Sequence, residues 1–261
     1  MLAQAHVNYH IISDQQQAYY IDANGEKGKI LAPVVVPTQI TVKDVRSNNS
    51  ELNFWRDSLT FIESHSQVSE FSQGSDWQAQ YDQELSTLLS TQINAKEVIV
   101  FDHTIRVDDS QSTRKPARNV HSDYSEHGAN ARLKDIMGDE KAKQWQQGHF
   151  GFVNVWRPVQ QVVKSAPLGF IRPQSILTKD WLLLRLIYPD RVGEILGVIA
   201  NTEHQWIYMA DMTPEEVAIF NIYDNQQLSP IAHSALDLIN EPNTAPTPIR
   251  KSIESRTLVR Y

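Results

Sequence analysis

In the stretch RNVHSDYS, His121 and Asp123 lie two positions apart, in a run that reads as a short strand or the end of one. Side chains two apart on an extended chain point to the same side, so an imidazole nitrogen and a carboxylate oxygen could bind one metal ion. The chain has 9 histidines, and 31 of its 261 residues are Asp or Glu, so a single His-x-Asp/Glu match is expected by chance. The pair therefore counts as evidence only together with a third ligand.

Two later segments could complete such a site. His233 lies in SPIAHSALD, and Arg250 and Ser252 form an Arg-x-Ser pair in RKSIESR. Two histidines and one carboxylate on one face of an octahedron are the ligands of non-haem Fe(II) oxygenases, and they leave the opposite face open. The guanidinium of an arginine can pair with a carboxylate of 2-oxoglutarate, and a nearby hydroxyl adds a hydrogen bond. The order His-x-Asp, His, Arg-x-Ser therefore has a chemical logic.

Each of these features is weak when taken alone. A lone histidine is more often a surface or loop residue than a ligand, and the range Arg56–Ser58 also matches Arg-x-Ser but precedes the His-x-Asp pair. The ordered set predicts an iron site with His121, Asp123 and His233 as ligands. Two alternatives stay open. One is an iron-dependent oxidase that takes its electrons from the substrate instead of 2-oxoglutarate, and the other is a non-catalytic β-barrel binding module with structural histidines.

The composition is that of a soluble globular protein. The 261 residues suit one large domain, and hydrophobic residues make up 41% and charged residues 21%. The 24 basic and 31 acidic residues give a formal charge of −7 without a basic run, so no nucleic-acid partner is predicted. The absence of cysteine excludes disulfides, thiolate nucleophiles and iron–sulfur clusters. We expect a cytoplasmic protein.

Neither a signal peptide nor a membrane span is predicted. The N-terminal stretch MLAQAHVNYHIIS has no basic region and no long apolar core. The most apolar segment, WLLLRLIYPDRVGEILGVIA, is interrupted by charged residues and cannot span a membrane. The sequence makes no prediction of the oligomeric state.

The first part of the chain is predicted to contain short strands and one long helix. Alternating or β-branched patterns favour extended chain over 6–12, 17–23 and 30–42. Apolar and aromatic residues at helical spacing predict a helix over 75–93, and a strand follows over 96–107.

The second part is predicted to change from helix to strands. The segment 125–145 reads as one or two helices with breaks at Gly128 and Gly138. Thr213, Pro214 and Glu216 resemble a capping box, so a helix competes there with a strand, which we favour. Many short strands after a helical hairpin indicate a jelly-roll or cupin-like barrel with flanking helices. The strands are expected over 149–159, 166–171, 181–188, 204–210, 215–223 and 252–261.

Seven stretches together resemble the family of CmcJ-like oxidoreductases and asaB-like hydroxylase/desaturases, which are Fe(II)/2-oxoglutarate dioxygenases of specialised metabolism. The resemblance implies a double-stranded β-helix fold, supports His121, Asp123 and His233 as iron ligands, and favours the strand near 215–223. In the family's order, the stretches are VFDHTIR (100–106), NVHSDYS (119–125), FVNVWRPV (152–159), APLGF (166–170), HQWIYMADMTPEEVAIFNIYD (204–224), AHSALD (232–237) and RKSIESRTLV (250–259).

The expected activity follows from this resemblance. It implies hydroxylation, desaturation or oxidative cyclisation of a small specialised metabolite or amino-acid-derived substrate, with Fe(II), 2-oxoglutarate and O₂. Arg250 and Ser252 are expected to bind 2-oxoglutarate. Arg256 shares the strand face of Ser252 and could be a second carboxylate contact or an internal salt-bridge partner. We favour the salt bridge. We expect a single dioxygenase domain over 1–261, with 1–95 as an N-terminal strand and helix extension packed on the barrel.

Five further residues are candidates for binding the substrate. Tyr124 could close the mouth of the pocket or cover a strand edge. Asn154 shares a strand face with Trp156 and could face the same cavity, and Arg157 could hold a carboxylate or be a structural arginine. Trp206 and Tyr208 alternate with their neighbours along a strand, so they could line the pocket or pack in the core.

Overall fold

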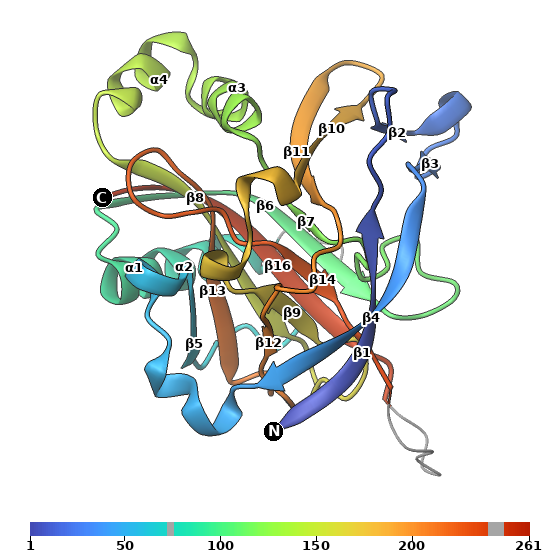
Figure 1. Cartoon of the computed structure of the whole chain (residues 1–261). Helices are drawn as coiled ribbons and strands as arrows, with labels where there is room; N and C mark the ends of the chain where they lie inside the picture. Colours follow the sequence, from blue (N-terminus) through green and yellow to red (C-terminus); the bar gives the residue numbers. More distant parts are fainter. Residues whose placement is uncertain (72–75, 240–247) are drawn as a thin grey trace.

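The computed structural model describes residues 1–71, 76–239 and 248–261, whose strands form an eleven-stranded and a five-stranded sheet (Figure 1). The larger sheet contains, in spatial order, β15 (Asp237–Leu238), β1 (Leu2–His10), β4 (Val35–Asp44), β12 (Trp206–Tyr208), β9 (Leu168–Ile171), β14 (His233–Ala235), β7 (His121–Ser122), β11 (Val192–Val198), β10 (Trp181–Ile187), β2 (Ala18–Ile21) and β3 (Ile30–Leu31). The smaller sheet contains β5 (Leu59–Glu63), β13 (Glu216–Asp224), β8 (Phe150–Pro158), β16 (Lys251–Arg260) and β6 (Glu97–Val107).

Helices flank the sheets, as expected for a mainly β protein with a double-stranded β-helix core. The helix predicted over 75–93 is α2, and residue 75 itself lies outside the described residues. The described helices are α1 (Phe54–Asp57), α2 (Gln78–Ile93), α3 (Glu126–Met137) and α4 (Asp139–Gln146), with 3-10 helices η1 (Ala23–Gly25), η2 (Arg46–Glu51), η3 (Pro173–Ser175) and η4 (Thr178–Asp180).

The two glycines expected to break the helical segment behave differently. Gly138 separates α3 from α4 and has a φ of 75°, which a residue with a Cβ rarely adopts. The break expected at Gly128 is wrong, because Gly128 lies inside α3. A Cβ there would come within 2.3 Å of the carbonyl oxygen of Glu194, so this glycine allows α3 to approach β11 closely.

The segment that resembled a capping box is a turn followed by a strand. Glu216 begins β13, and its carboxylate accepts a hydrogen bond of 2.8 Å from the backbone N–H of Thr213. This contact between Glu216 and Thr213 closes the turn. Pairing with β5 and β8 keeps the residues that follow Glu216 extended. The strand favoured from the sequence is confirmed.

The main hydrophobic core contains side chains from both sheets. Trp156, Phe220 and Leu258 of the five-stranded sheet belong to the same buried cluster as Phe170 and Ile207 of the eleven-stranded sheet. Alternation along each strand then decides which residues face away from this core. We call the face of the five-stranded sheet whose side chains belong to this cluster its inner face.

Two further clusters cover the outer faces. Tyr81 and Leu85 of α2 pack with Val153 and Ile253 on the outer face of the five-stranded sheet. A separate cluster joins β1 and β4 to residues of β9, β11 and β12. The strands of the first 95 residues consequently join both sheets, because β1 to β4 lie in the larger sheet and β5 lies in the smaller one.

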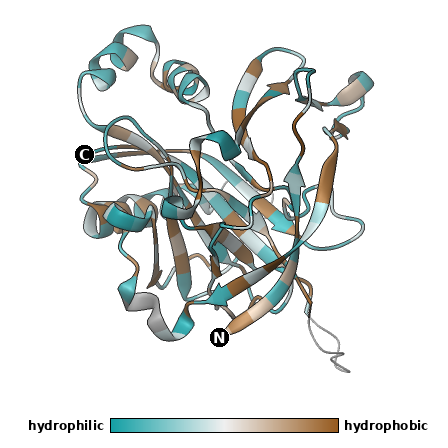
Figure 2. Cartoon of the chain, viewed as in Figure 1, coloured by the Kyte–Doolittle hydropathy of each residue, from teal (hydrophilic) through white to brown (hydrophobic). Residues whose placement is uncertain are grey.

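The inner face of the five-stranded sheet carries charged residues as well as apolar ones. Ser252, Glu254 and Arg256 alternate with the outward Ile253, and β6 places Arg106 directly opposite Ser252. Figure 2 shows hydrophilic and hydrophobic segments mixed along the strands of the sheets. Buried charge on an inward face is costly without partners, so these positions mark where function is to be sought.

Candidate metal centre

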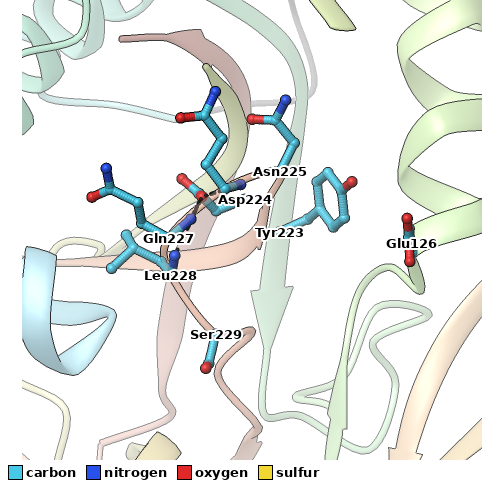
Figure 3. A pocket seen from close by; sticks show the side chains of 8 residues that line it. Glu126, Tyr223, Asp224, Asn225, Gln227, Leu228 and Ser229 are labelled. Carbon is cyan, nitrogen blue, oxygen red and sulfur yellow. Dashed lines mark hydrogen bonds between the residues drawn. The ribbon is translucent and has the colours of Figure 1, made fainter. Parts of the chain in front are cut away.

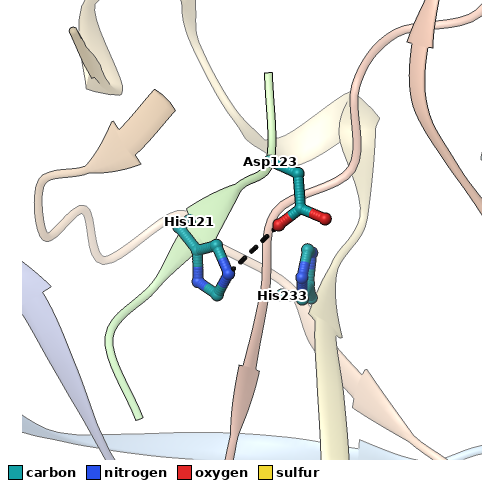
Figure 4. A group of neighbouring side chains, drawn as sticks. All are labelled: His121, Asp123 and His233. Carbon is teal, nitrogen blue, oxygen red and sulfur yellow. Dashed lines mark ion pairs between the residues drawn. The ribbon is translucent and has the colours of Figure 1, made fainter. Parts of the chain in front are cut away.

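Strands β7 and β14 bring the two histidines together. His121 and His233 are directly paired across the antiparallel ladder, and their ring centroids are 4.5 Å apart. Asp123 follows β7 two residues after His121, so its side chain returns to the same side. Figure 4 shows the three side chains converging, and their potential ligand atoms all lie within 4.8 Å of one another.

Backbone carbonyls orient both imidazoles. Nδ1 of His121 lies 2.8 Å from the carbonyl oxygen of Asn119, and Nδ1 of His233 lies 3.4 Å from that of Ile231. A carbonyl oxygen only accepts, so each Nδ1 carries the proton and each Nε2 keeps a free lone pair. This arrangement is typical of metal-binding histidines.

The carboxylate of Asp123 is held by one of its oxygens. Its Oδ2 accepts hydrogen bonds from Asn154 Nδ2 at 2.9 Å and from Arg256 Nε at 3.0 Å. Its Oδ1 lies 3.5 Å from His121 Nε2, on the side of the two imidazoles. One oxygen therefore fixes the carboxylate, and the other is directed to the position that a metal ion would take.

The electrostatics keep the ligands in the form that binds metal. Burial alone would raise the pKa of Asp123, but the charge of Arg256 and the neighbouring histidines hold it well below its usual range. Burial and the charge of His121 lower the pKa of His233 to about 3. At neutral pH the carboxylate is ionised and the His233 imidazole is neutral, as metal binding requires.

The backbone beyond Asp123 is fixed by α3. Ser125 is the N-cap of this helix and accepts a hydrogen bond of 2.9 Å from the N–H of Gly128. Its hydroxyl donates to the Glu194 carboxylate at 3.1 Å, and its N–H donates to the Glu194 carbonyl. Anchoring to β11 thus sets where the chain leaves the metal centre.

Arg250 and Ser252 are together at the start of β16. The Arg250 side chain is 2% exposed, donates to the carbonyl oxygen of Ala166, and bonds Ser252 Oγ at 3.1 Å. Its guanidinium lies over the ring of Trp156, 5.2 Å from the centroid. Its Nε is buried and has no hydrogen-bond partner in the described part of the chain. A buried donor without a partner is what an anion-binding position requires before its ligand arrives.

The substrate candidates are divided between the site and other parts of the fold. Tyr124 is next to Asp123, and its ring lies 4.9 Å from that of Phe152. Asn154 is at the centre, bonded to Asp123 as described above. The structure therefore brings these two candidates to the metal ligands.

The other three substrate candidates lie away from the ligands. Arg157 is on the outer face of the five-stranded sheet, where it donates to the carbonyl of Ser64, the carbonyl of Pro214 and the hydroxyl of Tyr81. Trp206 and Tyr208 belong to the cluster that joins β1 and β4 to residues of β9, β11 and β12, and the Trp206 indole donates to Tyr9 Oη at 2.8 Å. These contacts of the three side chains are thus with other parts of the fold.

A separate pocket lies beside the turn that connects β13 to β14. It has a volume of about 260 Å³ and is lined by Glu126, Tyr223 and the run 224–229. Figure 3 shows Tyr223 pointing toward Glu126 across this space. None of the three clustered ligands lines it, so it is distinct from the metal centre.

Arg106 was not among the residues singled out from the sequence. Its side chain lies on the same face of the five-stranded sheet as that of Ser252 in the Arg-x-Ser pair. The signal was present, because polar residues at Asp102, Thr104 and Arg106 alternate along the strand KEVIVFDHTIRV. Arg256 was expected to form an internal salt bridge, and it does so with Asp102, Asp123 and Glu254.

A family model described as "Oxidoreductase/YMDC permease-like domain" matches residues 7–260. The chain belongs to this oxidoreductase family. In the part of this oxidoreductase that the structure describes, no helix has both the length and the apolar character needed to cross a membrane.

Relatives of the oxidoreductase carry names consistent with the expected chemistry. It is 28% identical to "Hydroxylase/desaturase efuI" of Hormonema carpetanum, over 84% of this chain and 82% of the relative. It is also 28% identical to "Alpha-ketoglutarate-dependent dioxygenase phiK" of a fungal species, over 85% and 83% of the two chains. The resemblance to hydroxylase/desaturases inferred from the sequence is confirmed.

Solved structures support the fold. The "iron and alpha-ketoglutarate-dependent endoperoxidase NvfI" has a TM-score of 0.82 at 20% identity, covering 100% of this chain and 97% of NvfI. A second structure of NvfI, "with different conformation", has a TM-score of 0.86 and covers 100% of this chain and 98% of NvfI. The cupin-like, double-stranded β-helix expected from the sequence is confirmed by this likeness.

Proposed function

We propose that the protein is a non-haem Fe(II)- and 2-oxoglutarate-dependent dioxygenase. The observation that carries this proposal is the buried group of His121, Asp123 and His233, whose ligand atoms lie within 4.8 Å of one another. Two imidazoles and one carboxylate suit Fe(II) and leave part of its coordination sphere open. The names of a relative, an alpha-ketoglutarate-dependent dioxygenase, and of a structural neighbour, an iron and alpha-ketoglutarate-dependent endoperoxidase, support the same cofactors.

The chain's own residues bind and orient the reactants. His121, Asp123 and His233 would hold the iron, and Arg250 with Ser252 would bind the distal carboxylate of 2-oxoglutarate. When bound, iron and 2-oxoglutarate together supply oxidation of a C–H bond by O₂, with release of CO₂ and succinate. The protein fixes the orientation of the substrate and excludes water, and this orientation decides whether hydroxylation, desaturation or ring closure follows.

The substrate proposed is a small specialised metabolite or amino-acid-derived compound. Tyr124 is the candidate best placed to contact it, since it lies next to Asp123 and packs on Phe152. We propose one dioxygenase domain over 1–261, and the participation of β1 to β5 in both sheets supports this. The cytoplasmic location and the absence of nucleic-acid or membrane partners stay predictions.

The test is an anaerobic titration. Apoprotein is given Fe(II) and then 2-oxoglutarate, and the weak visible charge-transfer band of the chelate is followed in wild type, His121→Ala and Arg250→Met. We expect the band in wild type, its loss in His121→Ala because a ligand is missing, and its weakening in Arg250→Met because the carboxylate loses its buried partner. Succinate is then measured after O₂ is admitted.

Other outcomes would change the proposal in different ways. Bound iron without a band or succinate in wild type would favour an oxidase that uses its substrate as the source of electrons. Full retention of iron and ligand binding in His121→Ala would favour a binding module in which the histidines are structural.

A further inference from the structure

A second arginine lies beside the Arg-x-Ser pair. Arg106 of β6 is directly opposite Ser252 in the antiparallel ladder, so both side chains lie on the same face of the sheet. The strands stay together beyond this pair, because Asp108 N–H donates to the carbonyl of Arg250 at 2.9 Å. Arg106 therefore belongs to the same inward region as Arg250, although it is 144 positions away in the sequence.

Neither arginine has a carboxylate partner among the residues that the structure describes. Among the described residues, ion pairs within 4.0 Å involve neither Arg106 nor Arg250. In this part of the chain, the Arg106 guanidinium makes one side-chain hydrogen bond, to the carbonyl of Lys115 at 2.9 Å. Arg250 bonds only a carbonyl and a hydroxyl, and its Nε has no partner there.

The nearby carboxylates already form ion pairs with other arginines. Arg256 pairs with Asp102, Asp123 and Glu254, at 2.6, 3.0 and 2.6 Å. Asp108 is bound by Arg118 at 3.0 Å. The inward region thus holds two positive charges that the described chain does not neutralise by direct contact.

The consequence is visible in the protonation energetics. Burial and the charge of Arg106 lower the pKa of Arg250 to about 9. Burial also lowers the pKa of Arg106. Neighbouring cations without a paired anion are unfavourable, and an anionic ligand bound between them would remove this cost.

We propose that the distal carboxylate of 2-oxoglutarate is bound between Arg250 and Arg106, with Ser252 as the hydroxyl donor. This inference rests on the proposed function and adds a cosubstrate-binding residue that lies outside the Arg-x-Ser pair. A carboxylate has two oxygens and about four lone-pair sites, which is enough for two guanidiniums and one hydroxyl. The register opposite Ser252 is what brings Arg106 to the same carboxylate.

The experiment compares two 2-oxo acids in the Fe(II)-loaded protein without O₂. 2-Oxoglutarate has the distal carboxylate, and 2-oxopentanoate has the same chain length with a methyl group in its place. Dissociation constants of both are measured through the chelate band in wild type, Arg106→Gln and Arg106→Lys. Arg114→Gln is the matched control, because it removes the same charge from an exposed position near Arg106.

We expect Arg106→Gln to weaken 2-oxoglutarate binding by about 10- to 100-fold, as for the loss of a charged hydrogen bond. Binding of 2-oxopentanoate should be unchanged, since it has no carboxylate for Arg106 to contact. Arg106→Lys should recover part of the loss, and Arg114→Gln should have no effect.

Three results would overturn the proposal. They are an unchanged dissociation constant for 2-oxoglutarate, an equal loss for both 2-oxo acids, and a loss of the same size in Arg114→Gln. If Arg106→Gln fails to fold, Arg106→Lys decides, because a site built for a guanidinium fork should still lose 2-oxoglutarate affinity selectively. A missing band for 2-oxoglutarate in wild type would instead refute the proposed function.

Discussion

Replacing Asn154 by Leu tests whether this residue holds the metal ligand or contacts the substrate. Asn154 is 1% exposed, and its amide donates to Asp123 Oδ2 at 2.9 Å. A hydrogen bond to a charged acceptor contributes about 1.5–3 kcal/mol. Arg256 still bonds the same oxygen in the variant, so the lower end of this range applies. With tenfold in affinity for each 1.4 kcal/mol, Fe(II) binding should weaken by about 10-fold.

The assay is an anaerobic competition for Fe(II) against a chelator at pH 7. The matched control is Asn221→Leu on the neighbouring strand β13. Asn221 is also buried, and its amide donates to the Ser229 carbonyl at 3.1 Å and not to a metal ligand. Both variants should lose stability, and only Asn154→Leu should lose metal affinity. Equal Fe(II) affinity in Asn154→Leu and wild type would refute a positioning role.

Three further changes have defined outcomes. Arg157→Met should lower the free energy of unfolding by about 2–4 kcal/mol in denaturant titrations, because two partly buried carbonyls lose the buried arginine that donates to them, and should leave 2-oxoglutarate affinity unchanged. Gly197→Ala should destabilise the fold by about 1–3 kcal/mol in the same assay, because a Cβ would come within 2.6 Å of Leu184 and 2.7 Å of His10. Burial lowers the pKa of His10 from 6.5 to about 4. The unfolded chain therefore binds the proton first, and stability should fall by about 3 kcal/mol between pH 6.5 and 4. Unfolding of His10→Phe across this range should lack that component, and an identical pH profile would contradict the assignment.

The metal ligands could be predicted from the sequence because local rules position them. Spacing by two places His121 and Asp123 on one side of an extended chain, whatever the rest of the fold does. His233 joins these two ligands only because β14 pairs with β7, which is a contact between segments far apart in the sequence. The order of the motifs indicated His233 as the third ligand. The sequence indicated a short strand at His121, but β7 has only two residues, and nothing in the sequence indicated that β14 is its partner.

The substrate candidates show where local rules stop. Alternation already places Asn154 and Arg157 on opposite faces of β8, but it does not say which face is inward. That depends on α2, whose Tyr81 covers the outer face and bonds Arg157. Gly128 is a similar case, because the carbonyl oxygen of Glu194, on a strand distant in the sequence, leaves no room for a Cβ at this position. Both positions depend on contacts between segments far apart in the chain.

The inner face of the five-stranded sheet carries charged side chains whose counter-charges bound ligands would supply. Arg106, Arg250 and Arg256 all project from this face or its edge, and only Arg256 has carboxylate partners within the described chain. Apolar side chains there would stabilise the fold more, because buried ion pairs rarely repay their desolvation. A divalent cation beside Asp123, which pairs with Arg256 inside β16, and a dianion beside Arg250, which directly precedes β16, would supply the missing counter-charges. The charge pattern along β16 and β6 therefore connects the candidate metal centre with the Arg-x-Ser pair in a single electrostatic arrangement.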